Sequence, residues 1–547
     1  MKRHPVWRSR WSGCWLLCLS LCMASACTGT DSQADSGKKA PIAFTYFVNS
    51  PGDIVPEHSL IGDYIAERTG VSVQYERVVG EIDQKLGVMI GSKNYPDLIY
   101  GGDRTFRLLE ANALIPLEDL IREHAPNLFR LYGPHWERMK AADGHIYAIP
   151  LSVPTGKPNK WINAAFWVQK KVLKEAGYPT VRTFDQYVEL LREYSRKHPL
   201  YDGNETIPFE ILTYDKRNFT LTTPMQFLAG GPNDSLAMID PDSYQARFYQ
   251  LDESITKRYY DKLNDMYIEG LIDREAFVMN YDQYLEKLAS GRVLGMFDQS
   301  WQILEAQLAL KEQGKLEESY VPLPLTFDED IEEEYMDNTR MNYGFGFSIS
   351  VNCKDPVRAI EMADYMARDE VQALRFWGFK GENYSVTEQG RFYRTSEQRE
   401  WLKNKANRIR WSGDIMYFWP GSVGTMPDGN SYDPMQQPEE IEAEYSETDR
   451  ELLKAYGVRT YEDLFNPPNA KRKYFPAWSI ELSESAKEFD QKLKAINERI
   501  PPQMVVADTK EEFRKYWGEY VSALSSLDVE GWLDELETKI AERQSKW

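Results

Sequence analysis

A short apolar run that ends at a proline lies between two parts of this chain that share the same kind of pattern. The run spans residues 143–150 and consists of a polar turn, Asp-Gly, followed by a strand-like stretch. Strand-like and helix-like segments alternate both before and after it. A second extended segment, residues 342–350, follows the second alternating part. Two extended segments that join two α/β parts predict two lobes with a hinge and a cleft between them.

The alternation is clearest where the first lobe begins. Strand-like residues 42–48 and 71–79 flank a helix-like segment, residues 59–69, which Gly70 terminates. The apolar stretch 95–100 then runs into Gly-Gly-Asp103. Ligands of parallel sheets bind at the carboxyl ends of the strands, so Asp103 is a candidate ligand contact. The alternative is that Asp103 caps the helix expected at 105–111, and one residue can play both roles.

The second lobe offers a similar strand end. Residues 292–297 form an apolar, β-prone run, which predicts a buried strand. The polar residues that follow, beginning with Asp298, indicate that the chain leaves the core there. Trp301 is therefore expected to be partly exposed at the cleft. Its alternative is a place in the core of the second lobe.

Local signals also set several helix ends. Thr183 opens a capping box with Gln186, and Asp355 followed by Pro356 predicts a helix start. The tail from residue 480 reads as mostly helical. The pair Pro501-Pro502 is expected to break that helical tail, because proline removes a backbone donor.

The amino end has the layout of an export signal. Residues 1–26 comprise a basic stretch and an apolar segment that is too short to span a bilayer. Small residues precede Cys27, which predicts lipidation of Cys27 and a flexible tether over residues 27–41. The alternative is cleavage that leaves Cys27 unmodified. Outside the signal only Cys27 and Cys353 remain, so a lipidated Cys27 leaves no internal disulfide.

Composition and motifs argue against several functions. The formal net charge of −20 opposes non-specific nucleic-acid binding, which depends on Lys and Arg. The six histidines show no zinc-ligand spacing, and neither a nucleophile elbow nor a phosphate-binding glycine loop is present. We therefore expect that the protein is not an enzyme and that it binds neither a cofactor nor a metal. A carboxylate pair of a polysaccharide hydrolase or lyase would not be visible from sequence spacing, so that alternative stays open.

Aromatic residues at expected loops and strand ends suggest a site that stacks on sugar rings. Aromatic side chains make up 13% of the chain, and each one alone is more often a core residue than a ligand contact. Trp301 and Trp419 stand among polar or Gly and Pro residues, which favours exposure. Trp377 belongs to the same aromatic set. The candidate ligand-binding residues are Asp103, Tyr147, Trp161, Asp298, Trp301, Tyr343, Glu382, Tyr384 and Trp419.

Five segments, in their order and spacing, resemble extracellular solute-binding protein family 1, the lipoprotein receptors of carbohydrate ABC importers. They are residues 95–100, 143–150, 291–301, 344–356 and 377–384. The resemblance implies a two-lobe α/β fold of the type II periplasmic-binding class, each lobe with a mainly parallel sheet. It implies an oligosaccharide ligand that is passed to an ABC transporter permease, and it favours Trp301 as the stacking residue. A receptor for peptides in the same fold is the alternative within this class.

The resemblance also sets expectations for lobes, anchor and metal. The first lobe is expected to combine residues 42–153 with about 345–405, and the second lobe 154–344 with about 406–547. The protein is expected to be a monomer, held at the outer face of the cell membrane through Cys27. Larger relatives carry a calcium loop before an Ile-Pro pair, but here residues 201–208 make that loop look shortened. A hard cation needs six or more oxygen ligands, so we expect no calcium there.

Overall fold

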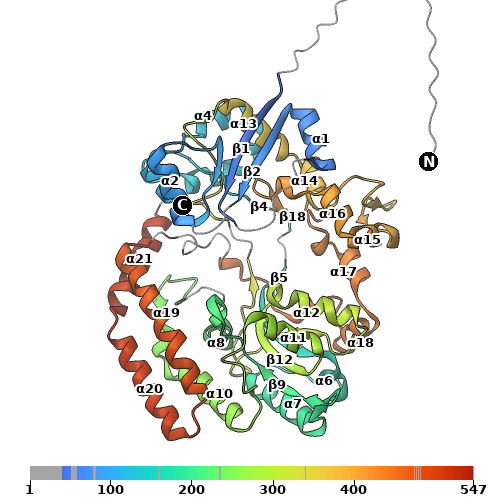
Figure 1. Cartoon of the computed structure of the whole chain (residues 1–547), viewed down its shortest axis with the longest axis vertical. Coiled ribbons are helices and arrows are strands. Elements are labelled where there is room, and N and C mark those ends of the chain that lie inside the picture. The colour runs from blue at the N-terminus through green and yellow to red at the C-terminus, as the bar shows by residue number, and fades with distance from the viewer. Residues whose placement is uncertain are drawn as a thin grey trace, which may run out of the picture. The chain divides into compact units, whose positions relative to one another are not determined.

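The first lobe is built on a four-stranded sheet whose last strand comes from late in the chain (Figure 1). In the computed structural model its strands, in spatial order, are β15 (Phe347–Ile349), β3 (Leu98–Tyr100), β1 (Ile42–Val48) and β2 (Val71–Arg77). Strand β1 pairs in parallel with β2 and β3, and β15 runs antiparallel to β3. The carboxyl ends of β1, β2 and β3 therefore meet at one edge of the sheet, beside the amino end of β15.

The structure describes residues 40–50, 58–77, 82–157, 160–232, 236–338, 341–472, 475, 477, 480 and 482–545. Cys27, the export signal and most of the tether lie outside these residues. The body, Ile42–Trp547, is one compact unit. Among the described residues, no helix combines the length and apolar character needed to cross a bilayer.

Both faces of the first sheet are covered, as the alternation in β1 requires. Phe44 and Tyr46 pack in the main core of the first lobe, whereas Phe47 packs in a smaller cluster on the opposite face. Helix α1 (Leu60–Thr69) begins at Ser59, which accepts from the Gly62 amide, and ends at Gly70, whose φ of 66° suits glycine. The other helices of this lobe are α2 (Ile82–Ser92), α3 (Thr105–Glu110), α4 (Glu118–His124), α5 (Pro126–Tyr132), α13 (Pro356–Met366), α14 (Asp369–Phe376), α15 (Ser396–Lys403) and α16 (Lys405–Trp411).

The second lobe contains the second four-stranded sheet. Its strands, in spatial order, are β13 (Tyr320–Leu323), β6 (Ala164–Gln169), β12 (Val293–Gln299) and β9 (Ile207–Glu210). Strand β6 is antiparallel to β12 and β13, and β12 is parallel to β9. Each sheet thus has three strands in one direction and one reversed strand. The reversed strand β6 is the first strand of its sheet after the chain enters the second lobe, and the reversed strand β15 is the first after the chain returns to the first lobe. The expected α/β class is confirmed, with sheets of mixed direction.

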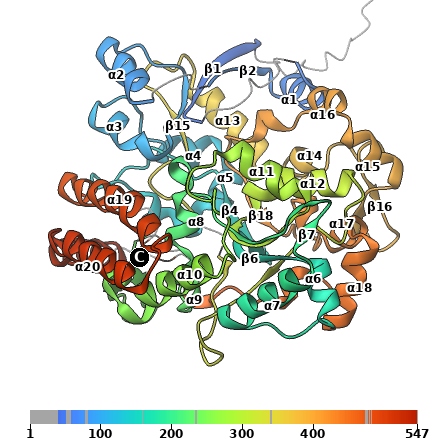
Figure 2. The ribbon, with the colours of Figure 1, turned by 60° about the horizontal axis from the view of Figure 1, so that its bottom comes forward.

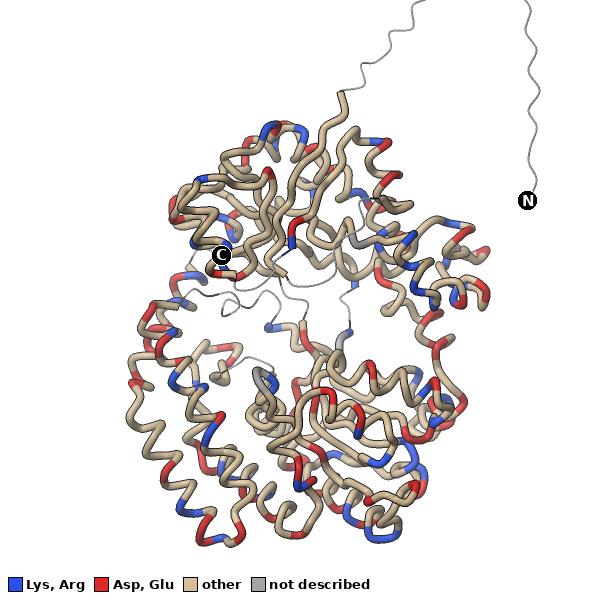
Figure 3. Tube along the Cα trace, in the orientation of Figure 1, with Lys and Arg blue, Asp and Glu red and all other residues tan. Residues whose placement is uncertain are grey.

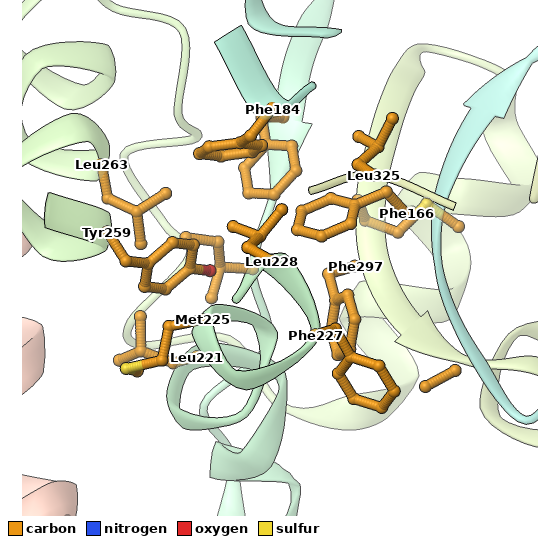
Figure 4. Close-up of a cluster of buried hydrophobic side chains, with 14 of the residues drawn as sticks. Phe166, Phe184, Leu221, Met225, Phe227, Leu228, Tyr259, Leu263, Phe297 and Leu325 are labelled. Atoms are coloured by element: carbon orange, nitrogen blue, oxygen red, sulfur yellow. The ribbon is translucent and has the colours of Figure 1, made fainter. Parts of the chain in front are cut away.

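Aromatic side chains fill the core of the second lobe (Figure 4). Phe166 on β6 lies 5.0 Å, between ring centroids, from Phe297 on β12, and Phe184 packs 5.2 Å from Phe166. The capping box at Thr183 that starts helix α7 is confirmed. The helices of this lobe are α6 (Lys170–Glu175), α7 (Phe184–Lys197), α8 (Phe219–Thr222), α9 (Pro224–Leu228), α10 (Arg258–Ile268), α11 (Tyr281–Ser290), α12 (Ser300–Glu312) and α18 (Glu447–Tyr456).

The chain passes between the two cores three times. The segment 143–150 does not itself cross, because Ile146 and Ile149 are buried in the first core. Two pairs of short strands lie at the crossings. Strand β4 (Val153–Thr155) pairs with β18 (Ser422–Gly424), and β5 (Trp161–Ile162) pairs with β14 (Met336–Asp337). Helix α17 (Pro438–Glu444) lies on the third connection. Met416 and Phe418 pack in the first core, so we propose a third lobe boundary after β18 and not near residue 406.

Three long helices end the chain beside the second lobe (Figures 1 and 2). They are α19 (Glu484–Val505), α20 (Lys510–Ser525) and α21 (Val529–Gln544). The expected break at Pro501-Pro502 is wrong, because α19 continues through both prolines. Pro501 cannot donate to the carbonyl of Asn497 one turn earlier. The Asn218 side chain donates to that oxygen instead, at 3.2 Å, so the missing hydrogen bond is replaced.

Candidate ligand-binding site

The first candidate surface lies where β1 and β3 end. The Asn49 side chain donates to the Gly101 carbonyl at 2.7 Å and holds the turn after β3. Gly102 adopts φ +57°, and a Cβ there would lie 3.2 Å from the Asn49 amide nitrogen, so this tight turn needs glycine. The Asp103 side chain is 71% exposed and pairs with Arg104 at 2.7 Å. Helix α3 begins without a side-chain cap, so Asp103 is a surface group and not the cap of that helix.

Aromatic rings surround this strand end and form what we call the first rim: Tyr100, Phe345, Tyr417 and Phe418. Their successive centroids lie 4.8 to 6.2 Å apart. The Arg77 guanidinium, at the end of β2, lies 5.0 Å from the centre of the Phe418 ring. Burial raises the pKa of Tyr100 to about 12, so its hydroxyl stays protonated and remains a hydrogen-bond donor. Tyr417 is half exposed.

The second candidate surface lies at the carboxyl ends of β9 and β12, which are parallel and share a sheet edge. Its rings, the second rim, are Phe219, Tyr281 and Trp301. Trp301 lies in the first turn of α12, is 53% exposed, and has its ring centroid 6.5 Å from that of Phe219. The Tyr281 hydroxyl donates to the Gln302 carbonyl at 2.7 Å. The expected partial exposure of Trp301 is confirmed, and a core position is excluded.

Asp298 does not lie at this surface, although the sequence suggested that the chain leaves the core there. Strand β12 continues to Gln299, and the Asp298 side chain is fully buried. Its carboxylate accepts from the Tyr284 hydroxyl at 2.6 Å, the Gln302 side chain at 2.5 Å and the Gln299 amide at 2.6 Å. Burial raises the pKa of Asp298 to about 6. These contacts tie the end of β12 to the start of α12, so the buried Asp298 side chain fixes the position of the turn that carries Trp301.

Three other candidates come together around a cavity of about 870 Å³. Asp103, Tyr147 and Tyr343 all contribute to its lining. The Tyr147 hydroxyl donates to Asp143 at 2.8 Å, and this hydrogen bond raises the pKa of Tyr147 to about 12. Tyr343 is only 6% exposed and belongs to the first core. Asp103 is therefore shared between the first candidate surface and this cavity.

The remaining candidates are placed elsewhere. Trp419 is 1% exposed, stacked on Phe347 at 4.9 Å, so the expectation that its Gly and Pro surroundings expose it is wrong. Trp377 is fully buried, and Tyr384 packs 5.5 Å from its ring. Glu382 is exposed on the loop before Tyr384. Trp161 lies in strand β5 at the crossing between the lobes. Ligand contact by these residues stays a prediction, and burial does not favour it for Trp419 and Tyr384.

Sequence reasoning missed several rings of the two rims. Tyr100 stands at the end of the expected strand 95–100, which is a signal that could have found it. Phe345 lies within the extended segment 342–350, and neither it nor Tyr417 was a candidate. Phe219 and Tyr281 begin helices α8 and α11. Nothing local marks them, because Phe219 is brought beside Trp301 by the parallel pairing of β9 with β12, and Tyr281 is brought near the start of α12 by the packing of α11 against α12.

The loop that corresponds to the calcium loop of larger relatives does not have the chemistry of a calcium site. It is a tight hairpin of β7 (Leu200–Tyr201) and β8 (Asn204–Glu205). The Lys171 ammonium lies 4.0 Å from the centre of the Tyr201 ring and 3.7 Å from Glu318. The Lys315 ammonium lies 3.8 Å from Asp202. Two cationic groups already neutralise the acids here and would repel a divalent cation.

The described residues do not suggest a metal-dependent site elsewhere. Among them, no group of three or more His, Cys, Asp or Glu side chains is arranged to hold a metal ion. The features that do converge at the sheet edges are aromatic faces and hydrogen-bonding groups. Such a combination suits a ligand with both apolar ring faces and hydroxyl groups.

Comparison with known proteins adds the family. The model of the family described as bacterial extracellular solute-binding protein matches residues 61–382, which is more than half of the chain. A comparison with curated proteins found no match.

Solved structures show the same fold. The substrate-binding protein FusA of Streptococcus pneumoniae, in complex with kestose, matches with a TM-score of 0.64 at 18% identity, over 92% of this chain and 100% of that one. The HMO-binding solute-binding protein of Bifidobacterium longum infantis matches with a TM-score of 0.66 at 13% identity, over 92% of this chain and 99% of that one. The alginate-binding protein AlgQ2, without calcium ion, matches with a TM-score of 0.61 at 16% identity, over 92% of this chain and 99% of that one. The fold is that of two-lobe periplasmic binding proteins, and by its family match the chain belongs to the bacterial extracellular solute-binding proteins.

Proposed function

We propose that this protein captures an oligosaccharide between its two lobes and delivers it to the permease of an ABC transporter. The observation that carries the proposal is the exposed ring of Trp301 among the aromatic residues at the edge of the second sheet. Sugar rings have apolar faces that stack on aromatic side chains, and their hydroxyl groups bind polar side chains. Covering one face of Trp301 would contribute on the order of 1–2 kcal/mol from apolar area.

The first rim supplies the complementary surface in this proposal. Its half-exposed Tyr417 offers a ring face, and Asp103 and Tyr100 offer an acceptor and a donor. The relatives of similar fold include FusA, described in complex with kestose, and an HMO-binding protein. That similarity supports an oligosaccharide over a peptide.

The location follows from the family and from the amino end. The family is extracellular, and we propose that lipid on Cys27 holds the body at the outer face of the membrane as a monomer. Acidic side chains are spread over the helices of both lobes (Figure 3), in keeping with the net charge of −20. Such a body would not adhere to an anionic membrane by itself, so an anchor is needed to keep it near the permease.

A thermal-shift screen of plant and microbial oligosaccharides, followed by chromatography of the recovered sugar, tests the proposal. A binding protein is stabilised by about 2.7 kcal/mol at 100-fold saturation and returns the sugar unchanged. Shortened sugar would instead indicate a polysaccharide hydrolase or lyase. Stabilisation by peptides and by none of the sugars would indicate a peptide receptor.

A further inference from the structure

The cavity of about 870 Å³ is closed on one side by helices that lie outside the family match. The match ends at residue 382, whereas Lys487 and Asp490 of α19 and Lys539 and Arg543 of α21 line the cavity. These helices are fixed to the second lobe, because Phe489 packs in its core. The C-terminal helices therefore form one wall of the cavity.

The opposite wall belongs to the first lobe. Asp103, Phe106, Tyr147 and Phe345 contribute to it. The Lys487 ammonium lies 4.9 Å from the centre of the Phe106 ring, which is a direct contact between α19 and the first lobe. The cavity thus lies between the lobes, where a closing movement would change its size.

The cavity is continuous with the first rim. Phe345 belongs to both, since it packs against Tyr100 at 6.2 Å and also lines the cavity. Asp103, three residues after Tyr100, lines the cavity as well. A ligand stacked at the first rim that extends past Asp103 would enter this space. The volume is within the range of ligand pockets, about 300–1,000 Å³.

The lining has the chemistry of a sugar site. Phe106 and Tyr147 offer ring faces, and charged side chains of both signs, among them Asp490 and Lys487, can bind hydroxyl groups. The Asp490 carboxylate accepts from the Trp532 indole at 3.1 Å and is held in place by it. Both signs are present around the cavity, which favours a neutral polyhydroxylated ligand over a strongly charged one.

We propose that this cavity is an end subsite: it holds the terminal residues of an oligosaccharide whose other end is stacked at the two rims. The C-terminal helices would then make the protein select longer oligosaccharides over disaccharides. This inference rests on the proposed function and adds to it the size class of the ligand.

Calorimetry with size ladders tests it. Inulin-type fructo-oligosaccharides, malto-oligosaccharides, cello-oligosaccharides and xylo-oligosaccharides are each titrated from the disaccharide to the hexasaccharide. In the ladder that binds, affinity should rise by about tenfold or more between the shortest and the longest members, a change of about 1.4 kcal/mol. Equal affinity along the ladder would overturn the inference.

Two variants locate the effect. Ala142→Trp should fill the cavity from the first lobe, and Lys487→Ala should remove part of the α19 wall. Both should reduce the advantage of the longest member by about tenfold and leave binding of the shortest member unchanged. Ala406→Trp on α16 and Lys494→Ala on α19, which are exposed positions outside the cavity lining, should behave as wild type.

The outcomes separate the two proposals. Equal weakening of short and long members by the cavity variants would overturn the end subsite while leaving the proposed function in place. Binding of no ladder member and of no other oligosaccharide would remove the proposed function, and the end subsite with it. Melting temperatures of all variants are measured first. If Ala142→Trp or Lys487→Ala does not fold, the other cavity variant, on the opposite wall, is used for the comparison.

Discussion

At the scale of single residues, exposure separates a tryptophan of the proposed site from a tryptophan of the core. Trp301 is 53% exposed and Trp419 is 1% exposed, although Trp301 follows polar residues and Trp419 is followed by Pro and Gly. Stacking on a ligand needs a free ring face, and Trp419 has its face covered by Phe347. The residue types beside each tryptophan therefore did not predict the exposure of its ring, because exposure depends on what packs against the ring in the folded protein, as Phe347 packs against Trp419.

Replacing each tryptophan with alanine should give opposite results. Trp301→Ala should weaken oligosaccharide binding by about tenfold and leave the melting temperature unchanged, since it removes a half-exposed ring. Trp419→Ala should cost about 3–5 kcal/mol of unfolding free energy, because it opens a cavity in the core. Titration calorimetry and thermal unfolding of both variants check this. An unstable Trp301→Ala, or one that binds as wild type, contradicts the site.

Asp298 should make part of the stability depend on pH. Its folded pKa of about 6 lies above the ordinary value of 3.8, so the folded protein binds this proton more tightly than the unfolded chain. The resulting stability is complete below about pH 4 and is lost as the pH rises through about 6.

The matched variant isolates this effect. The difference in unfolding free energy between wild type and Asp298→Asn should fall between about pH 4 and 6, by at most about 3 kcal/mol, and then stay constant. Denaturant unfolding at several pH values measures the difference. A difference that does not change with pH would show that Asp298 keeps an ordinary pKa.

At the scale of elements, local sequence signals predicted the helices and strands better than the ways in which they join. The helix end at Gly70, the cap at Thr183 and the start of α13 at Asp355 are confirmed, because each depends on a few neighbouring residues. The continuation of α19 through Pro501 could not be predicted. It depends on Asn218, which is distant in the sequence and supplies the missing hydrogen bond.

The same limit applies to the site. The carboxyl ends of predicted strands pointed to Asp103 and Trp301, and both side chains are exposed in the structure. Phe219 lies beside Trp301 because β9 pairs with β12, and strand order is set by the whole sheet. Tyr281 lies there because α11 packs against α12. The third lobe boundary was expected near residue 406 and is proposed here after β18, because β18 is short and is defined by its pairing with β4.

The β7–β8 hairpin should be stable without calcium. Chelation of divalent cations should leave the melting temperature unchanged, because Lys171 and Lys315 occupy the positions beside Glu318 and Asp202. Lys171→Met should cost about 1–3 kcal/mol, since it leaves the mostly buried Glu318 carboxylate without its cation. Lys492→Met, at an exposed helical pair, is the control and should change little. A fall in melting temperature on chelation would contradict this account.

At the scale of the whole molecule, the proposed lipid anchor on Cys27 has a role separate from that of the lobes. Cys27→Ser should release the protein from cell membranes into the medium or the soluble extract, because no other lipid attachment is expected. Fractionation followed by immunoblotting measures this. Ligand binding by the released protein should equal that of the soluble body, Ile42–Trp547. A Cys27→Ser protein that stays with the membrane would point to a different anchor.

The movement of the lobes connects the residues to the function. Both rims lie at sheet edges, and the sheets belong to separate cores joined by three short connections. A ligand that contacts both rims favours the arrangement in which they approach, because binding energy is gained only there. Hinge movement of two rigid lobes is the expected response.

Small-angle X-ray scattering with and without the oligosaccharide identified in the thermal-shift screen tests the central claim most directly. At a saturating concentration confirmed by calorimetry, wild-type protein should show a smaller radius of gyration and an altered scattering curve. Trp301→Ala at the same ligand concentration should respond less, in proportion to its lower occupancy. Identical curves with and without saturating ligand would contradict the claim that the two lobes close on a bound oligosaccharide.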